Sequence, residues 1–382
     1  MQFTFTEEQR MIRDAVAALL AEQSASAQVR AAMAGTTGTD AALWQALAVD
    51  MQACAVLVPE HLGGLGAGFV EAALIGEQLG RHVACVPFHA TVGLAASTLL
   101  SCADDAQQAA WLPGIAAGTT IASTAGLAYA ERKCADGARF LPHGDGYLLS
   151  GHFAAVPHAH VADLLLVVAQ AETGDTALFA LPAGSAGLTA RHVPSMDQTR
   201  AQGEVLLNDV ALPASARLAR ADEKSLATAR DCATVLIAAE LLGVADASLV
   251  MAVDYTGERR QFGRAIASYQ AIKHRAADML LKAELARSAV YYAACVASEA
   301  LFGRDDAARK VAQELGQAAS LAKTYASEAA FYNAGSALQL FGGVGFTWEY
   351  DVHLYFKRAQ SCSHFLGSPT LHRERIARAL LD

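Results

Sequence analysis

Hydrophobic side chains recur every three to four residues through the first third of the chain, which is the spacing of one helix face. Behind Thr6, this spacing is kept by four apolar residues: Met11, Ile12, Ala15 and Leu19. Threonine is a favoured N-cap, so we predict that the first helix begins after Thr6. Further helices are predicted over residues 43–49, 69–80 and 107–115. These elements define an expected N-terminal α-helical domain, residues 1–117.

The pattern changes near residue 118, where long helical periods give way to short aliphatic and β-branched runs. Polar turns lie between the runs, which cover residues 120–122, 146–149, 164–168, 176–179 and 205–207. Short strands at this spacing predict a small β-barrel or sandwich. We expect this middle β-barrel domain to span residues 118–222.

Helical spacing returns at residue 226, in an alanine-rich part of the chain. Long segments are predicted over residues 226–260, 269–302 and 306–341, and a shorter one over residues 368–380. Alanine favours helices and lets them pack closely, so we expect a four-helix bundle over residues 223–382. The predicted fold class is α+β, with helical domains before and after a β domain.

The charge balance excludes some classes of function. The chain carries 29 Lys and Arg against 38 Asp and Glu, a net charge of −9, and it has no basic tract. A nucleic-acid-binding protein needs a basic patch, so we expect no nucleic-acid partner. The most apolar long segment, residues 232–253, contains Glu240 and Asp246, and the first residues lack the pattern of a signal peptide. We therefore expect no membrane span.

Cysteine and histidine residues form no recognisable disulfide or metal pattern. The seven cysteines are scattered, without a Cys-x-x-Cys pair, which suits buried thiols in a reducing cytoplasm. His152, His158 and His160 lie in the β region, but a zinc site needs at least one more ligand. We expect these histidines on an exposed strand face and predict no metal site.

Some residues in the C-terminal third are of types that a packed core does not need. They lie in three segments: residues 255–263, Gln270 and residues 339–346. Arg259 or Arg260 offers a planar fork that suits a pyrophosphate. Phe262 offers an aromatic face, and Gly342 with Gly343 lets backbone approach a ligand closely. The segments therefore have the groups of a nucleotide-binding surface.

A plainer interpretation exists for each segment taken singly, because Gly263 and Gly342 can serve as helix C-caps. Together, however, the segments resemble the FAD-binding segments of the acyl-CoA dehydrogenase family. The family also has a helical domain, a β-barrel and a helical bundle in this order, so the resemblance covers essentially the whole chain. Other similar segments are residues 58–64, 151–163, 195–200, 209–213 and 345–350.

The resemblance implies FAD-dependent α,β-desaturation of an acyl-CoA thioester. In the family, a carboxylate removes the α-proton while a hydride leaves the β-carbon for the flavin. An electron-transfer flavoprotein is the implied electron acceptor. The motifs found in this chain reach the FAD that is bound mainly by a neighbouring subunit. The residues implied to contact this FAD are Arg259, Gln261, Phe262, Gln270, Gln339, Gly342 and Gly343.

The chain departs from the family at the catalytic base. The usual glutamate position falls on Leu366, and the alternative position on the first bundle helix falls on Ala233. Neither side chain can take a proton, so the catalytic residue is unknown. Asp231 lies two residues from Ala233, about 200° around a helix, and should face elsewhere. We interpret Glu240 as a buried or interface carboxylate.

The β domain departs from the family as well. The family's loop that contacts the flavin ring and the acyl chain corresponds to residues 124–127 of this chain. Of these residues, only Thr124 can repeat a flavin contact. The strand behind the ring appears as residues 155–157. Pro157 has neither the backbone N–H nor the hydroxyl of the family's threonine. The segments that would hold this chain's own flavin are therefore degraded.

This pattern of losses resembles dehydrogenases built from two different subunits, which act on bulky acyl-CoAs such as steroid side chains. We hypothesise that the chain is the partner without the base, in a heterotetramer with a paralogous acyl-CoA dehydrogenase subunit. One alternative is a self-sufficient homotetramer with a relocated base, Asp231 or Glu240. Another is a non-catalytic scaffold that binds CoA or FAD. A flavin oxygenase of the same fold gains no specific support.

Overall fold

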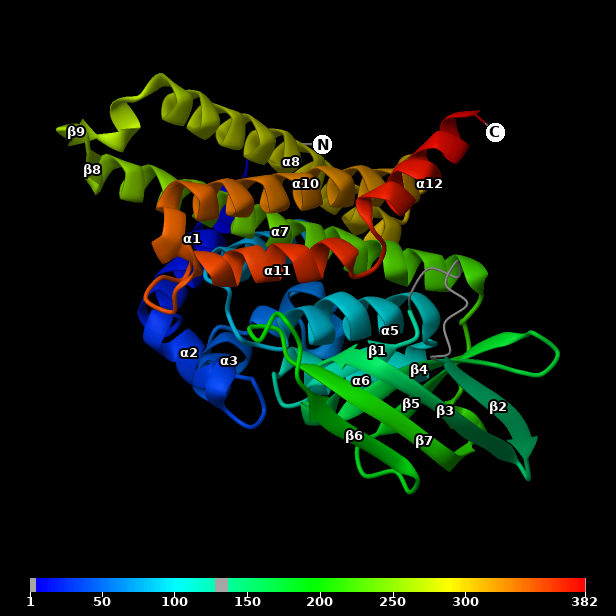
Figure 1. Ribbon diagram of the computed structural model, residues 1–382. Coiled ribbons are helices and arrows are strands. Elements are labelled where there is room, and N and C mark those ends of the chain that lie inside the picture. Colours follow the sequence, from blue (N-terminus) through cyan, green and yellow to red (C-terminus); the bar gives the residue numbers. More distant parts are fainter. Residues whose placement is uncertain (1–4, 128–136, 382) are drawn as a thin grey trace.

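The structure, a computed structural model, describes residues 5–127 and 137–381. N-terminal helices and a curled sheet lie side by side, and the C-terminal helices cover both (Figure 1). This arrangement confirms the predicted α+β class. The expected boundaries at residues 117/118 and 222/223 stay predictions; strand β1 begins at Ala122 and helix α7 at Glu223.

The first helix of the N-terminal region is fixed by its cap. The Thr6 hydroxyl accepts the backbone N–H of Gln9 at 3.1 Å, and the Gln9 side chain accepts the N–H of Thr6 at 3.0 Å. This reciprocal capping box confirms the predicted start. The helices here are α1 (Glu7–Gln23), α2 (Ser26–Ala34), α3 (Ala41–Gln45), α4 (Phe69–Arg81), the π-helix η4 (His89–Ala96), α5 (Ser97–Cys102) and α6 (Asp105–Ala116). The sequence pattern does not predict α2, η4 or α5.

The middle region is a seven-stranded sheet of order β1-β4-β2-β3-β7-β6, with β5 paired to β4. β4 pairs in parallel with β1 and β2, while the other neighbours are antiparallel. The sequence pattern misses β2 and β6 because their side chains are mostly exposed and give little hydrophobic alternation. The strands are β1 (Ala122–Ala125), β2 (Gly137–His143), β3 (Gly146–Pro157), β4 (Leu164–Gln170), β5 (Thr176–Pro182), β6 (Leu188–Val193) and β7 (Gln202–Pro213).

The C-terminal helices form the predicted bundle with more helices than expected. The helix predicted over residues 306–341 is divided in two by a turn at Gln313 and Glu314, and α11 is not predicted. The helices are α7 (Glu223–Glu258), α8 (Gln270–Phe302), α9 (Asp306–Ala312), α10 (Leu315–Phe341), α11 (Val352–His364) and α12 (Pro369–Leu381).

Helix α7 connects the bundle to the N-terminal region through close backbone contact with α4. A Cβ atom on Gly80 would lie 2.0 Å from the Glu240 carbonyl oxygen, and one on Gly243 would lie 1.9 Å from that of Glu77. Only glycine permits this approach. By length and composition α7 is apolar enough to cross a membrane, but 78% of its apolar window is buried inside the protein. It is the central core helix of the molecule.

Candidate functional site

The predicted cofactor-binding residues gather at one end of the bundle. Helix α7 ends at Glu258 and leads into a hairpin of two short strands, β8 (Arg260–Gln261) and β9 (Arg264–Ala265). The two turn residues, Phe262 and Gly263, have φ of 52° and 81°. Two positive φ angles suit a tight two-residue hairpin turn, but a positive φ is uncommon for phenylalanine. Gly263 is therefore a hairpin residue and not the predicted helix C-cap.

This turn projects an aromatic ring into solvent. The Phe262 side chain is 92% exposed, although a ring of this size normally buries itself. Strained backbone that holds an apolar ring away from the core is typical of a binding residue. Phe262 therefore fits the predicted contact with a nucleotide or a partner.

The end of α10 lies beside this hairpin. The Phe341 ring stacks on Tyr255 of α7 with centroids 4.1 Å apart, and the Tyr255 hydroxyl donates to the Phe341 carbonyl at 3.4 Å. Gly342 caps α10 with a φ of 68°, as the plainer interpretation expects. Gly343 has no positive φ angle that would require glycine, and a Cβ atom there would meet nothing within 4 Å. Nothing within the described chain explains why residue 343 is glycine.

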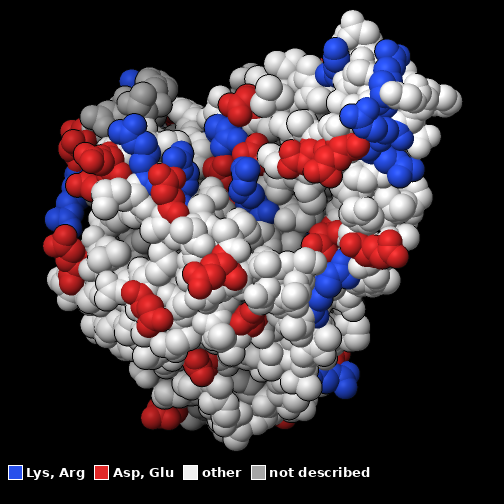
Figure 2. Space-filling model, turned by 90° about the vertical axis from the view of Figure 1, so that its left-hand side faces the viewer, with Lys and Arg blue, Asp and Glu red and all other residues white. Residues whose placement is uncertain are grey.

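All seven predicted contact residues are exposed, at the end of the bundle that faces the viewer in Figure 2. Arg259, Gln261 and Phe262 belong to the hairpin segment, and Gln270 begins α8. Of the remaining three, Gln339 lies in the last turn of α10, and Gly342 and Gly343 begin the 3-10 helix η8 (Gly342–Phe346) that follows it. Basic side chains gather at an upper corner of this face, which suits an anionic diphosphate. The arrangement fits the half of an FAD site that one subunit lends to another.

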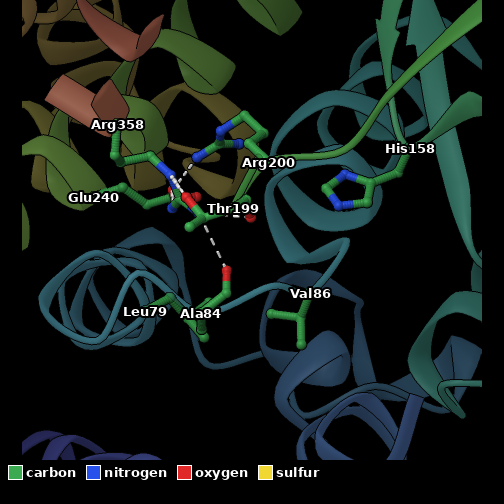
Figure 3. Close-up of a pocket in the computed structure, with 8 residues that line it drawn as sticks. All are labelled: Leu79, Ala84, Val86, His158, Thr199, Arg200, Glu240 and Arg358. Atoms are coloured by element: carbon green, nitrogen blue, oxygen red, sulfur yellow. Dashed lines mark hydrogen bonds and ion pairs between the residues drawn. The ribbon is translucent and has the colours of Figure 1, made fainter. Parts of the chain in front are cut away.

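The region where the sheet, the N-terminal helices and the bundle meet has the opposite character. Arg358 of α11 donates to Asp197 at 3.0 Å and to the Thr199 carbonyl at 2.8 Å, both in the loop between β6 and β7. Its other contacts reach Glu240 of α7 at 3.4 Å and the Ala84 carbonyl at 3.3 Å. One guanidinium therefore joins all three regions of the fold (Figure 3).

A second arginine completes this buried cluster. Arg200 also pairs with Glu240, and the side chains of Arg200, Arg358, Asp197 and Glu240 are each at most 5% exposed. Two positive and two negative charges balance, which is the condition under which buried charges are tolerated. We call these four residues the junction cluster.

The junction cluster encloses very little space. The cavity beside it has a volume of about 10 Å³ and is lined by Thr199, Arg200, Glu240, Arg358 and His158, among others (Figure 3). That volume holds about one water molecule. A small-molecule site needs roughly 300–1,000 Å³. Among the described residues, the junction therefore has no room for a flavin ring and an acyl chain.

His158 corrects the expectation of an exposed strand face. It follows the last residue of β3, has a φ of 54° and is only 2% exposed. Neither ring nitrogen has a hydrogen-bond partner among the described residues, and burial lowers the pKa of His158 well below its usual value. His152 instead lies on β3 and pairs with Glu204. The described residues hold no group of three or more side chains placed to bind a metal.

The two positions where the family carries its base hold Ala233 and Leu366 in this chain. Both residues are buried, and the backbone carbonyl of each lies next to a histidine. His89 of η4 donates its Nε2–H to the Ala233 carbonyl at 3.0 Å, and its ring lies edge-on to Phe365 with centroids 5.6 Å apart. The Leu366 carbonyl lies 3.0 Å from His372 Nε2. Ala233 and Leu366 are 0% and 6% exposed. A substrate cannot reach either residue in this conformation.

The two carboxylates considered as relocated bases are held by arginines. Asp231 makes two ion-pair contacts with Arg375 of α12, at 3.0 and 3.1 Å. Glu240 accepts from both arginines of the junction cluster. As expected, Asp231 and Ala233 face different neighbours. Both carboxylates are therefore already engaged by arginines of the same chain.

Lys323 of α10 is a buried cation that the sequence interpretation missed. It is 0% exposed and donates to the carbonyls of Cys362 and Ser363 at 2.6 and 3.1 Å, at the end of α11. Burial lowers the pKa of Lys323 to about 7. The sequence does contain a signal for the burial of Lys323. This residue shares a helix face with Ala319, Ala326 and Ala330, all of which are buried.

The flavin-facing part of the β domain is only partly described. Thr124 of β1 is 4% exposed, and its hydroxyl has no partner among the described residues. The Pro157 carbonyl accepts from Ser123 at 2.7 Å and is thus already used. The residues that follow Leu127 in the loop lie outside the described range. The Thr124 hydroxyl is therefore available to a ligand, whereas Pro157 has no N–H that it can donate to one.

The sequence matches two family models. Residues 6–119 match "Acyl-CoA dehydrogenase, N-terminal domain" and residues 228–381 match "Acyl-CoA dehydrogenase, C-terminal domain". Among curated relatives, "Acyl-CoA dehydrogenase IpdE2" of Mycolicibacterium smegmatis is 31% identical over 98% of both chains. This likeness extends over the sheet as well as the two helical regions.

Two solved structures with similar chains are assemblies of two named components. A chain of the ChsE4-ChsE5 complex from Mycobacterium tuberculosis has a TM-score of 0.88 and 27% identity, over 100% of this chain and 99% of that one. A chain from a variant of the "Tcur3481-Tcur3483 steroid ACAD" has a TM-score of 0.84 and 28% identity, over 98% of both chains.

Proposed function

The chain belongs to the acyl-CoA dehydrogenase family of FAD-dependent oxidoreductases, and from that premise we propose that it is the base-lacking subunit of a two-subunit enzyme. It lends the exposed end of its bundle to an FAD whose reactive half is held by a second, base-carrying subunit of the same family. The two subunits together desaturate a bulky acyl-CoA thioester.

One observation carries this proposal: both positions where the family carries its base are buried and hold aliphatic side chains, Ala233 and Leu366. Ala233 and Leu366 cannot accept a proton, and the cavity beside Arg200 and Glu240 measures about 10 Å³. An enzyme of this family needs a carboxylate at the α-carbon of the thioester. This chain therefore needs that carboxylate from another subunit.

The residues at the bundle end have definite tasks in such an assembly. Arg259 and Gln270 would hold the diphosphate and ribitol region, and Phe262 would pack on the adenosine half. Gln339, Gly342 and Gly343 would line the same pocket, where the absence of a side chain lets backbone meet the cofactor. When bound, FAD accepts the hydride from the β-carbon of the thioester.

We further propose a steroid side chain or a similarly bulky acyl group as substrate. Support comes from the solved relatives, one of which is named a "steroid ACAD". A subunit without its own acyl cavity halves the number of active sites and leaves room for a wide substrate. An electron-transfer flavoprotein is the proposed acceptor. The six free cysteines among the described residues support a reducing, cytoplasmic setting.

The decisive experiment compares the chain alone with the chain co-expressed beside a base-carrying homologue from the same genome. We expect flavin absorbance and desaturation of a steroid side-chain CoA thioester only in the co-purified complex. The complex should favour this thioester over butyryl-CoA by about tenfold or more in kcat/KM. Full FAD occupancy and turnover by the lone chain would refute the proposal.

Amide substitutions separate the proposal from a self-sufficient enzyme. If Asp231 or Glu240 were the base, Asp231→Asn or Glu240→Gln would lower turnover by about 100-fold or more. We expect neither to do so in the complex beyond its effect on folding, which a melting curve reports. A complex without any flavin absorbance would favour a scaffold.

A further inference from the structure

Three polar side chains from separate parts of the fold meet at the small cavity beside the junction cluster. His158, Arg200 and Glu240 all line this cavity, whose volume is about 10 Å³ (Figure 3). His158 follows the last residue of β3, Arg200 lies in the loop between β6 and β7, and Glu240 lies on α7. A ligand held by all three would therefore connect the sheet to the bundle.

His158 has the fewest hydrogen bonds of the three side chains. Neither Nδ1 nor Nε2 has a partner among the described residues, and the residue is only 2% exposed. In Figure 3 its ring points from the end of β3 towards Arg200. Buried polar groups are nearly always bonded to protein or to ordered water, so this imidazole calls for a partner. Because burial lowers the pKa of His158 well below its usual value, the neutral ring offers one N–H and one lone pair.

Arg200 and Glu240 supply a donor and an acceptor at the same place. The Arg200 Nε–H group is buried and has no acceptor among the described residues. The hydrogen bonds that Glu240 accepts from Arg200 and Arg358 both end on Oε2. Oε1 is therefore the carboxylate oxygen that a ligand in the cavity would meet. Together with the imidazole, the lining offers three hydrogen bonds to one small ligand.

The backbone at His158 directs its ring into this lining. Its φ of 54° is left-handed, a conformation that is uncommon outside glycine but is adopted by histidine more often than by most residues. The His158 N–H donates to the Ala201 carbonyl at 3.0 Å, which fixes the turn after β3. A polar ring turned inward without a hydrogen bond destabilises the fold. The turn therefore suits a ring that has a hydrogen-bond partner inside the cavity.

The size and charge of the cavity decide which ligand fits. A volume of about 10 Å³ is close to that of one water-sized sphere. Polyatomic anions and organic ligands are larger. The two arginines of the junction cluster balance its two carboxylates, so the site has no net charge with which to hold an ion. A buried water molecule typically makes about three hydrogen bonds to otherwise unpaired groups.

We propose that the cavity is a binding site for one ordered water molecule, held by His158, Arg200 and Glu240. The water oxygen accepts the Arg200 Nε–H, and one water hydrogen is donated to Oε1 of Glu240. The third hydrogen bond is made with a ring nitrogen of His158. The water thereby joins the end of β3 to the loop between β6 and β7 and to α7. This inference does not depend on the proposed function.

The first test is a crystal structure of the protein at a resolution that shows ordered water molecules. We expect one water peak within hydrogen-bond distance of Arg200 Nε, Glu240 Oε1 and a ring nitrogen of His158. A cavity without density, or a ring nitrogen bonded directly to a protein atom, would overturn the site. A crystal soaked in bromide distinguishes water from an anion, because an anomalous peak in the cavity would identify a halide site and would overturn the proposal as well.

A second test asks whether His158 holds the water in solution. His158→Phe keeps an aromatic ring but has no ring nitrogen. Oxygen-17 relaxation dispersion detects water molecules held inside a protein, and it should show one long-lived water fewer in this variant than in the parent. The melting temperature should also fall by a few degrees. The matched control is His143→Phe at the exposed end of β2, which should change neither quantity.

The outcomes of the second test separate the site from the role of the histidine. An unchanged water count and melting temperature in His158→Phe would refute His158 as a ligand of the water. Equal changes in His158→Phe and His143→Phe would do the same. If His158→Phe does not fold, the crystal structure of the parent decides the question.

Discussion

The junction cluster and the bundle end place similar residue types in opposite environments, one buried and one exposed. At the junction, Arg358 and Arg200 are buried and paired with Asp197 and Glu240. At the bundle end, Arg259 is exposed and Phe262 is 92% exposed. The junction satisfies its polar groups inside the chain, whereas the bundle end presents them outward.

This difference separates stability from function within one chain. A side chain whose partners lie in its own fold contributes to folding, and its removal leaves other groups unpaired. A side chain without internal partners contributes little to folding, so its identity calls for an external contact. The junction should therefore respond to mutation in unfolding experiments, and the bundle end in cofactor-binding experiments.

The largest effect is expected at the junction. Arg358→Ala would remove a cationic partner of the buried carboxylates Asp197 and Glu240. The free energy of unfolding should therefore fall by about 3–5 kcal/mol. Urea unfolding measures this change. The control is Arg309→Ala, because the ion pair of Arg309 with Asp306 is exposed and its loss should change stability by less than about 0.5 kcal/mol. Equal losses in both variants would contradict the comparison.

At the bundle end, Arg259→Ala should act on FAD instead. The loss of one charged contact to a diphosphate corresponds to about 2 kcal/mol, or roughly 30-fold in the Kd of the two-subunit complex for FAD. Unfolding should be unchanged. Arg264→Ala is the matched control on the same hairpin, since its guanidinium stacks on Tyr269 at 3.9 Å. Fluorescence titration measures the Kd, and similar losses for both arginines would remove the specific role of Arg259.

A smaller effect concerns pH and the buried histidine His89. Burial lowers its pKa to about 4, below the value of about 6.5 in an unfolded chain. Between these values the unfolded state binds more protons, so stability is fully present above pH 6.5 and is lost as pH falls towards 4. His89 should contribute at most about 1.4 kcal/mol per pH unit.

The measurement compares the parent with His89→Phe in urea unfolding at about pH 7.5, 6 and 5, one value above the two pKa values and two between them. Other buried histidines, such as His158 and His372, titrate in both proteins, so only the difference between them reports on His89. The difference should shift in favour of the variant as pH falls. A constant difference at the three pH values would show that His89 is not a neutral buried group.

The smallest effect on folding is expected at Gly343. A Cβ atom there meets nothing within 4 Å, so Gly343→Ala should change stability by less than about 0.5 kcal/mol. FAD affinity of the complex should nevertheless fall severalfold, because the backbone can no longer approach the cofactor as closely. Gly257→Ala on α7 is equally open and should leave affinity unchanged. Parallel behaviour of the two variants would argue against a cofactor at Gly343.

The parts of the fold that follow from local pattern were predictable. Helix α1 has both its cap and its apolar period in one short segment, and α7 has a long alanine-rich run. Helix α11 was not predictable in this way, because several of its core-facing side chains are polar, including His353, Arg358 and Ser363. Polar residues at buried positions interrupt the run of apolar positions by which a helix face is recognised.

The same distinction holds for the candidate site. The hairpin motif is encoded in a few consecutive residues, so its residues could be named in advance. The junction is assembled from Ala84, the segment 197–200, Glu240 and Arg358, which come from four separate parts of the sequence. Only the tertiary structure shows that these residues meet, and that the space between them is filled.

The junction cluster also limits which substitutions this protein can tolerate. Each of its four charges balances the others, so replacing one alone passes through a chain with an uncompensated buried ion. That step costs about 3–5 kcal/mol, a large share of the roughly 5–15 kcal/mol that keeps a protein folded. Any one of the four residues is therefore expected to be exchanged only together with a compensating change at one of the other three.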